Sequence, residues 1–449
     1  MPRRLFGTDG IRGRAGQEPL VESTVRRLGA ALARQLAELA AAPLVLVAGD
    51  TRGSTPEIRS WVVSGLAAAG ARAADLGTLP TAAVAHLTRS RSAAAGVVVS
   101  ASHNPARDNG IKLVAADGFK WSVARERELE RRLAAEAEPP ARRVTPTPPE
   151  VVAGAREEYA RALRDQLPAG TPLAGLRLAL DCSHGAASGW SPLFAAAGAV
   201  VESLFDRPDG SNINRGCGAT SPAKLAKRVR AGGFALGFAF DGDADRAILI
   251  DERGEVRDGD AMLYLWARDL ASRGELAPPC VVATSMSNLG LERALAGCGI
   301  AVERCDVGDR HVVETLRRSG LRLGGEQSGH LLDLRRSTTG DGLLTALVLC
   351  ELVARSGRPA SELLSGFRRY PQLLLNVPVR AKPDLASLPR VAGAAQEIER
   401  RLGEDGRLVL RYSGTEPLAR IMLEGPDQAT IDGYAAELEA VIRTEIGAD

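Results

Sequence analysis

The chain has 449 residues, of which 45% are hydrophobic and 25% are charged, and its formal net charge is +2. A single core does not grow to this length, so about two to four domains of a soluble globular protein are expected. The basic residues are mostly Arg and are spread along the chain, and charges interrupt the apolar stretches, so neither a nucleic-acid-binding face nor a membrane span is indicated.

The N-terminal segment Met1–Gly7 is charged but lacks an apolar stretch, so it does not predict a signal peptide. Six cysteines lie far apart and form no Cys-x-x-Cys pair, which favours reduced thiols over a disulfide scaffold or a zinc site. Both features predict a cytoplasmic protein.

Short apolar runs alternate with segments of helical periodicity through most of the chain. Buried strands are predicted at Leu44–Ala48, Gly96–Val99, Leu176–Leu180, Ala235–Phe240 and Val281–Ala283. Helices are predicted at Ser23–Ala41, Pro56–Ala69, Gly154–Leu167, Ser221–Ala231 and Asp260–Arg273. This alternation predicts an α/β architecture with largely parallel strand pairing.

Changes in composition suggest where the domains divide. A proline-rich connector at Pro139–Pro149 follows the first domain, and the pattern changes again near Tyr370–Lys382. The remainder is predicted to be a small α+β domain with strands at Leu373–Val377, Arg407–Tyr412 and Ala419–Glu424. A hairpin-like turn near Asp251–Asp258 suggests that the middle part divides again. We therefore predict four domains, at residues 1–150, 151–255, 256–368 and 369–449.

The first loop with chemical character follows the strand at Gly96–Val99 and contains Ser-His-Asn-Pro. Asn-Pro and Asn-Gly force tight turns, so Ser102 is presented at a strand end, where α/β proteins place reacting groups. An ordinary polar turn stays an alternative for this loop taken alone. A serine hydrolase is not indicated, because the Gly-x-Ser-x-Gly elbow is missing. His103 is adjacent in sequence, so its side chain is not expected to reach the Ser102 hydroxyl.

The second loop places Asp241, Asp243 and Asp245 between two apolar strands. Carboxylates bunched in this way repel one another unless a cation compensates them, and oxygen ligands suit Mg²⁺. An EF-hand is disfavoured because Arg246 stands at its glycine position and strands flank the loop. A phosphatase with an Asp nucleophile and a solvated acidic turn stay alternatives for this loop alone.

The third loop, Gly324–His330, places Glu326, Ser328 and His330 at alternate positions. The glycines between them are expected to let a ligand approach the backbone, and the polar side chains suit hydrogen bonds to sugar hydroxyls. Taken alone the motif is weak, because Gly/Ser loops with one His are common.

The fourth loop is predicted to bind phosphate. Arg411 and Arg420 bracket Ser413, Gly414 and Thr415 on a turn, which combines guanidinium forks with hydroxyl and amide donors. The P-loop pattern is missing, so a nucleotide site is not indicated. A surface turn with two solvated arginines stays an alternative for this loop alone.

Taken in this order, the four loops resemble those of the α-D-phosphohexomutase superfamily: SASHNP, DGDADR, GEQSGH and RYSGTEP. The resemblance covers nearly the whole chain. Phe6–Gly13, Gln327 and Val307–Arg310 resemble the branch that acts on glucosamine phosphates more than the branches for mannose or glucose phosphates. The chain departs from the usual pattern at Asp181–Gly185, at Cys217–Pro222 and at His311, all outside the four loops.

The resemblance implies three consecutive α/β domains with mixed sheets and a smaller C-terminal α+β domain, arranged around a central cleft. It implies a mutase that interconverts glucosamine 6-phosphate and glucosamine 1-phosphate, feeding cell-wall synthesis, with a bisphosphorylated sugar as intermediate and primer. A phosphomannomutase or phosphoglucomutase is the alternative within the superfamily, and a non-catalytic sugar-phosphate sensor is an alternative outside catalysis. The implied partner is a small phosphosugar, with no nucleic acid and no membrane, and a homodimer is implied.

The resemblance also implies roles for individual residues. A phosphorylated Ser102 and the three aspartates would bind one Mg²⁺. Glu326, Ser328 and His330 would recognise the sugar, while Arg411, Ser413, Gly414, Thr415 and Arg420 would hold the non-reacting phosphate. His103, Lys112, Arg246 and His330 are candidates for charge stabilisation or proton transfer, and Arg12 is a further candidate site residue.

Overall fold

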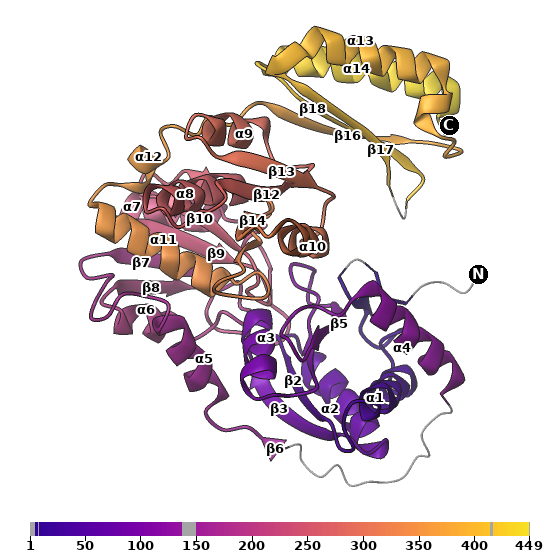
Figure 1. Cartoon of the computed structure of the whole chain (residues 1–449), viewed down its shortest axis with the longest axis vertical. Helices are drawn as coiled ribbons and strands as arrows, with labels where there is room; N and C mark the ends of the chain where they lie inside the picture. Colours follow the sequence, from indigo (N-terminus) through magenta and orange to yellow (C-terminus); the bar gives the residue numbers. More distant parts are fainter. Residues whose placement is uncertain (1–4, 8, 137–149, 414–415, 449) are drawn as a thin grey trace. The chain divides into compact units, whose positions relative to one another are not determined.

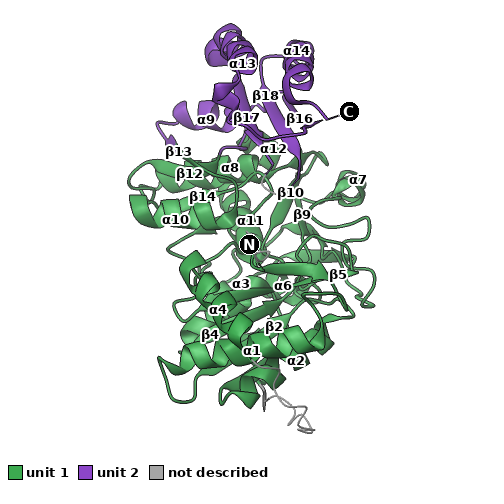
Figure 2. Ribbon diagram, turned by 90° about the vertical axis from the view of Figure 1, so that its right-hand side faces the viewer, with its two compact units in different colours: residues 1–284, 303–364 green, residues 285–302, 365–449 purple. Residues whose placement is uncertain are grey.

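The computed structural model describes residues 5–7, 9–136, 150–413 and 416–448. Its strands form separate sheets in successive parts of the chain (Figure 1). The chain divides into two compact units, one of residues 1–284 and 303–364 and the other of residues 285–302 and 365–449 (Figure 2). We call them unit 1 and unit 2 and describe each by itself. Within the described residues, no helix is long and apolar enough to cross a membrane.

The first sheet of unit 1 has the strand order β1-β5-β4-β2-β3-β6. Its strands are β1 (Ile11–Arg14), β2 (Leu44–Gly49), β3 (Arg72–Thr78), β4 (Ala95–Val99), β5 (Asp108–Ala115) and β6 (Glu150–Val151). The helices of this part are α1 (Glu22–Ala37), α2 (Thr55–Ala68), α3 (Thr81–Ser90) and α4 (Val123–Ala135). Strand β4 is buried throughout, and β5 returns antiparallel to it, so the serine loop joins two neighbouring strands.

The second sheet has the strand order β11-β10-β9-β7-β8. Its strands are β7 (Arg177–Asp181), β8 (Val200–Leu204), β9 (Leu236–Phe240), β10 (Ala247–Asp251) and β11 (Val256–Arg257). The helices are α5 (Ala155–Arg164), α6 (Ser191–Ala196) and α7 (Ala223–Gly232). Strands β9 and β10 are buried along their whole length and pair antiparallel from Phe240 and Ala247, so the three aspartates occupy a tight connection between core strands.

The third sheet includes β12 (Cys280–Thr284), β14 (Leu323–Gly325) and β15 (Leu331–Asp333). The helices of this part of unit 1 are α8 (Gly259–Ser272), α10 (Asp309–Ser319), α11 (Gly342–Ser356) and α12 (Ala360–Leu363). Strand β13 (Ala301–Cys305) crosses the boundary between the two units. Strands β14 and β15 pair antiparallel, with Gly325 opposite Leu331, so the predicted sugar loop is a hairpin turn.

Unit 2 contains an antiparallel sheet of order β16-β18-β17. The strands are β16 (Gln372–Pro378), β17 (Arg407–Tyr412) and β18 (Leu418–Glu424). The helices are α9 (Leu289–Ala296), α13 (Pro389–Leu402) and α14 (Gln428–Ile446), with short 3₁₀ turns at Leu385–Ser387 and Gly403–Asp405. Helices α13 and α14 lie over one face of the sheet (Figure 1), and apolar side chains from both layers form the core.

The strands and helices predicted from periodicity are confirmed, with ends that differ by a few residues. The expectation of largely parallel pairing is wrong in part, because each sheet of unit 1 joins parallel strands to an antiparallel edge. For β4–β5, β9–β10 and β14–β15 the cause is local: a short connection returns the chain beside the strand it has just left, which requires antiparallel pairing. The antiparallel pair β1–β5 joins strands that are far apart in the chain. The four domain ranges stay predictions.

Candidate active site

Ser102 lies in the turn after β4, and its side chain is completely buried. Its φ of +50° is in the left-handed region, where a residue other than glycine is uncommon and often marks a functional turn. The hydroxyl donates a hydrogen bond to Asp241 Oδ2 at 2.5 Å. The fold therefore brings together the serine of the first loop and the first aspartate of the second.

His103 corrects one expectation. Its Nδ1 lies 3.3 Å from Ser102 Oγ, although adjacency in the chain was expected to keep the two apart. The positive φ of Ser102 turns the backbone so that both side chains face the same region. Burial, and then the charges of Arg246 and Arg12, lower the pKa of His103 to about 4, so its ring is neutral near pH 7.

Arg52 holds the serine loop, and sequence analysis did not single it out. Its guanidinium is fully buried and donates to the carbonyl oxygens of Ser102 at 2.7 Å, Asn104 at 2.9 Å and Asp108 at 3.0 Å. The Nε atom pairs with Asp50 Oδ2 at 2.8 Å. One cation thus binds several carbonyls of a single turn, which fixes the loop backbone around Ser102.

Removing Arg52 is expected to destabilise unit 1. In Arg52→Ala, Asp50 becomes a buried carboxylate without its cation, which costs about 3–5 kcal/mol of unfolding free energy. Urea unfolding followed by circular dichroism measures the loss. The control is Arg107→Ala on the same loop, whose side chain is 69% exposed and should change stability by less than about 0.5 kcal/mol. Equal losses in the two variants would contradict the assignment.

Asn214 supports the same loop from the second sheet. Its Nδ2 donates to Ser102 O at 2.8 Å and to Asn104 O at 3.0 Å. Its own backbone N–H donates to Ser183 O at 2.9 Å, two residues after the buried Asp181. The carboxylate of Asp181 accepts from the backbone N–H groups of Ser183 and Gly218, both at 2.9 Å. The segment that departs from the usual family pattern therefore supports the serine loop indirectly.

Asp181 predicts a measurable pH dependence of stability. Burial raises its pKa to about 6, against the two backbone donors, whereas the unfolded chain has the ordinary value of 3.8. The folded state therefore binds the proton more tightly, so this residue makes stability rise as the pH falls from about 6 to about 4. The full effect is about 3 kcal/mol at most. Urea unfolding across this range should show a flatter profile for Asp181→Asn, and an unchanged profile would contradict the assignment.

The three aspartates converge as predicted. One carboxylate oxygen from each of Asp241, Asp243 and Asp245 lies within 4.8 Å of the others, and all three side chains are buried. The Oδ1 atoms of Asp243 and Asp245 are buried and have no hydrogen-bond partner among the described residues. Burial, and then the charges of Asp245 and Asp243, hold the pKa of Asp241 well above its usual value. Clustered carboxylates with two buried oxygens that lack a hydrogen-bond partner fit a divalent cation such as Mg²⁺.

Lys112 supplies part of the positive charge that the sequence pattern assigned to a metal. Its Nζ lies 2.8 Å from Asp243 Oδ2 and 3.0 Å from Asp245 Oδ2. Thr81 also donates to Asp243 Oδ2, at 2.6 Å. These contacts leave the opposite oxygens of the two carboxylates free, so Lys112 and a cation can bind at the same time. Despite burial, the aspartates hold the pKa of Lys112 well above its ordinary value.

Asp9 is a site residue that sequence analysis missed. Its carboxylate lies 3.1 Å from Lys112 Nζ and 2.6 Å from Lys120 Nζ, and it also pairs with Arg12. Against the effect of burial, these cations hold the pKa of Asp9 well below its usual range. Arg12 in turn donates to Ala101 O at 3.0 Å. Asp9 and Arg12 belong to the motif Phe6–Gly13, in which Thr8 lies outside the described residues.

Arg246 lies where the serine, metal and sugar loops meet. Its Nη1 is 3.4 Å from His103 Nδ1, and its Nε is 3.8 Å from Asp245 Oδ1. Burial would lower the pKa of Arg246, but Asp245, Asp241 and Glu326 outweigh burial and raise the pKa. A fixed positive charge therefore faces both the serine loop and the sugar loop.

The sugar loop differs from the expectation that its glycines let a ligand approach the backbone. Gly329 has a φ of +90°, and a Cβ there would overlap the carbonyl oxygen of Ala247, so this glycine serves close packing against β10. Glu326 Oε1 accepts from Gly308 N at 3.0 Å, and Ser328 is exposed. His330 is buried, and neither ring nitrogen has a hydrogen-bond partner in the described part of the chain.

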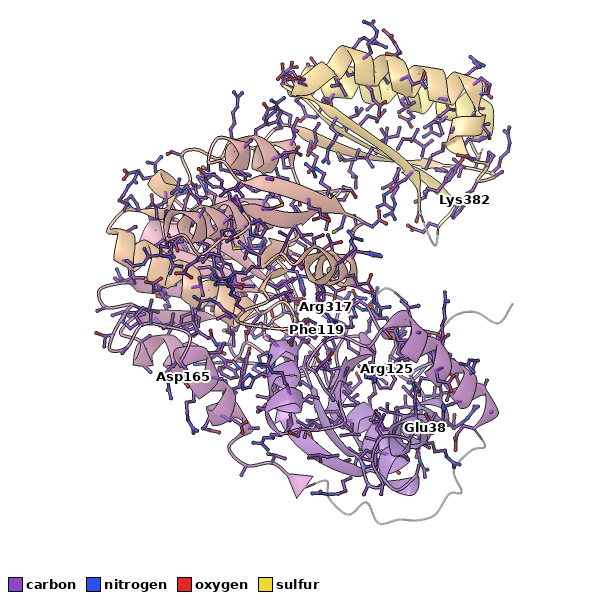
Figure 3. The ribbon with its side chains drawn as sticks, in the orientation of Figure 1. Glu38, Phe119, Arg125, Asp165, Arg317 and Lys382 are labelled. Atoms are coloured by element: carbon purple, nitrogen blue, oxygen red, sulfur yellow. The ribbon has the colours of Figure 1, made fainter. Side chains whose placement is uncertain are left out.

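The motif Val307–Arg310 connects the start of α10 with residues 120–126, which belong to the part of unit 1 that contains the first sheet. Asp309 pairs with Lys120 at 2.9 Å, and Arg310 forms a buried pair with Glu126 at 2.5 Å. Close by, the Arg317 guanidinium lies over the ring of Phe119, 4.4 Å from its centroid (Figure 3). These contacts join the parts of unit 1 that carry the serine loop and the sugar loop.

The predicted phosphate loop belongs to unit 2. Arg411 and Arg420 are opposite each other on β17 and β18, so their side chains project from neighbouring strands. Lys382, which sequence analysis missed, donates to Ser413 O at 2.6 Å (Figure 3). Glu416 forms an ion pair with Arg420 at 2.8 Å. It forms no ion pair with Arg411 or Lys382 among the described residues. Gly414 and Thr415 lie outside the described residues.

Comparison with known families finds matches along most of the chain. The four parts of the family Phosphoglucomutase/phosphomannomutase match in order: alpha/beta/alpha domain I at residues 3–140, domain II at 157–254, domain III at 258–370 and the C-terminal domain at 374–441.

Two relatives that match over nearly their full length share one name. A phosphoglucosamine mutase of Anaeromyxobacter dehalogenans is 45% identical over 98% of this chain and 100% of its own length. The phosphoglucosamine mutase of Koribacter versatilis is 45% identical over 99% of this chain and 98% of its own length.

Solved structures share the fold. A phosphoglucomutase/phosphomannomutase family protein from Burkholderia thailandensis superposes with a TM-score of 0.82 at 24% identity, covering 99% of each chain. An N-acetylphosphoglucosamine mutase from Aspergillus fumigatus, in complex with GlcNAc-6P and magnesium, has a TM-score of 0.66 at 19% identity and covers 98% of this chain and 95% of its own.

Proposed function

Since the chain belongs to the phosphoglucomutase/phosphomannomutase family, we propose that it interconverts glucosamine 6-phosphate and glucosamine 1-phosphate. The observation that carries this assignment is the 45% identity, over nearly full length, to phosphoglucosamine mutases. The site supports the reaction class independently: a buried Ser102 hydroxyl is hydrogen-bonded to the first of three clustered aspartates.

In the proposed cycle, Ser102 carries the phosphoryl group. The Ser102 O–P bond breaks as a free hydroxyl of the bound sugar phosphate forms a new O–P bond, and the proton of that hydroxyl ends on Ser102 Oγ. The bisphosphorylated sugar then returns its other phosphate to Ser102 and leaves as the isomer. No net oxidation or hydrolysis occurs. Phosphoryl transfer of this kind depends on position and charge more than on covalent chemistry.

Residues of unit 1 provide the position and much of the charge. Arg52 and Asn214 hold the turn so that Ser102 Oγ points at the aspartates. Lys112 and Arg246 place fixed positive charge near the phosphoryl oxygens. Asp241, Asp243 and Asp245 would hold a Mg²⁺ ion, which would supply further positive charge for the phosphoryl oxygens. The neutral His103 lies close enough to Ser102 to exchange a proton with it.

The remaining roles are proposed from the resemblance and supported by local chemistry. Glu326, Ser328 and His330 recognise the sugar, and the buried ring nitrogens of His330 have no hydrogen-bond partner among the described residues. Arg411, Ser413 and Arg420 hold the phosphate that is not reacting, with Lys382 as a third cation. A bisphosphorylated sugar primes Ser102, and the enzyme works in the cytoplasm as a homodimer.

The experiment that tests the function compares substrates directly. Purified protein with Mg²⁺ and a bisphosphorylated sugar primer is given glucosamine, glucose or mannose 6-phosphate at equal concentration, and 1-phosphate formation is followed by ³¹P NMR. Glucosamine 6-phosphate should react fastest. Faster turnover of glucose or mannose phosphate would move the enzyme to another branch of the family, and no turnover at all would leave a sugar-phosphate sensor.

A further inference from the structure

A second cavity of unit 1 shares no residue with the four chemical loops. It has a volume of about 150 Å³ and is bordered by α3, α5 and the segment between β15 and α11. Three arginines line it, Arg89, Arg335 and Arg336, together with His86 and Tyr159. The proposed mutase reaction uses none of these side chains.

Two of the three arginines in this cavity have no protein partner. Arg89 and Arg335 are exposed, and neither has an ion-pair or hydrogen-bond partner for its guanidinium in the described part of the chain. Arg336 is more buried: its Nη1 donates to Gln166 O at 2.9 Å, and its Nε lies 3.4 Å from Asp333 Oδ2, at ion-pair distance but without hydrogen-bond geometry. Burial lowers the pKa of Arg336, and nearby arginines add to this effect while Asp333 opposes it.

The acidic and hydroxyl groups of the wall are already engaged. Asp341 accepts from Tyr159 Oη and from Leu344 N, and although burial raises its pKa to about 6 it is mostly ionised near pH 7, with its charge directed at these donors. Ser337 Oγ and Thr338 Oγ1 each donate to a carbonyl oxygen at 2.7 Å. The donors that remain for a ligand are therefore the guanidinium groups.

Guanidinium groups with unused donors suit one class of ligand. Arginine matches the oxygens of phosphate with paired hydrogen bonds, and three such groups around one cavity favour a multiply charged oxyanion. Ala82 and Leu163 contribute apolar wall beside the arginines, which can contact a carbon skeleton.

We propose that this cavity binds a phosphorylated small molecule, with the phosphate on Arg89, Arg335 and Arg336 and the carbon part against Ala82 and Leu163. The site is separate from Ser102, the aspartates and the Arg411–Arg420 loop. It does not depend on the proposed mutase activity.

Calorimetric titration with inorganic phosphate tests the site. The full chain carrying Arg411→Gln and Arg420→Gln is the background, because it removes the arginines of the predicted phosphate loop, and the Ser102 site is the same in every variant compared. In that background, adding Arg89→Gln and Arg335→Gln should weaken phosphate binding at least about tenfold, as expected for lost charge-assisted hydrogen bonds. Both side chains are unpaired, so circular dichroism should show an unchanged fold.

A matched control removes the same charge elsewhere. Arg72 and Arg127 are exposed, lie outside the lining of the cavity and have no side-chain partner among the described residues, so Arg72→Gln with Arg127→Gln tests net charge alone. This pair should weaken phosphate binding less than about twofold. Equal weakening by both pairs, or no saturable phosphate binding in the background protein, would overturn the proposal.

Discussion

Ser102→Ala is expected to lower the rate of phosphosugar interconversion at least about ten-thousand-fold, since it removes the atom that carries the phosphoryl group. The substitution deletes one buried hydroxyl, whose only strong acceptor is Asp241 Oδ2, so the fold should remain. A coupled assay measures turnover, and intact-protein mass spectrometry shows whether the primer transfers a phosphoryl group to the chain.

Ser60→Ala is the control for this prediction. Ser60 is exposed on α2 and donates only to Glu57 O, so its removal should leave turnover and phosphorylation unchanged. Retained turnover in Ser102→Ala would refute the phosphoserine mechanism. A phosphoryl group found on Asp241 in place of Ser102 would favour the phosphatase alternative that the acidic loop alone leaves open.

Asp241→Asn is expected to separate catalysis from stability. In the metal-free protein, burial and the neighbouring carboxylates favour the protonated form of Asp241, and an asparagine resembles that form in shape and charge. The free energy of unfolding without metal should therefore not fall. Mg²⁺ should no longer raise the melting temperature, because one of three ligands is lost, and turnover should drop at least about a thousandfold.

The matched control is Asp165→Asn (Figure 3). Asp165 is exposed at the end of α5 and has no side-chain partner in the described part of the chain. This variant should keep both the Mg²⁺-dependent rise in melting temperature and full activity. A rise that persists in Asp241→Asn would place the cation elsewhere.

Local pattern was enough to predict the elements and the loops. Strands β4 and β9 are runs of buried apolar residues, and such runs stand out in any sequence because the core excludes polar side chains. Ser102 and Asp241 lie in the connections that follow these strands, and they were recognised because strand ends present side chains at one edge of a sheet. Strand direction was harder, since a short run carries no signal for a parallel or an antiparallel partner.

The supporting residues could not be predicted in the same way. Arg52 and Asn214 are ordinary polar residues in sequence, and only the folded chain places them against the carbonyl oxygens of Ser102 and Asn104. Asp9 lay within a recognised motif, but its three cations come from different places in the chain. Lys382 gave no sequence signal, because its acceptor is a backbone carbonyl, which every residue has.

Ser102 and the three aspartates were thus determined by the sequence itself, because their chemistry resides in the side chains and their spacing follows strand ends. Tertiary structure alone decided that the Ser102 hydroxyl meets Asp241, that Lys112 neutralises Asp243 and Asp245, and that His103 turns toward its neighbour. The physical reason is distance. Hydrogen bonds and ion pairs act over a few ångströms, and residues far apart in the chain come that close only when the cores of unit 1 have formed.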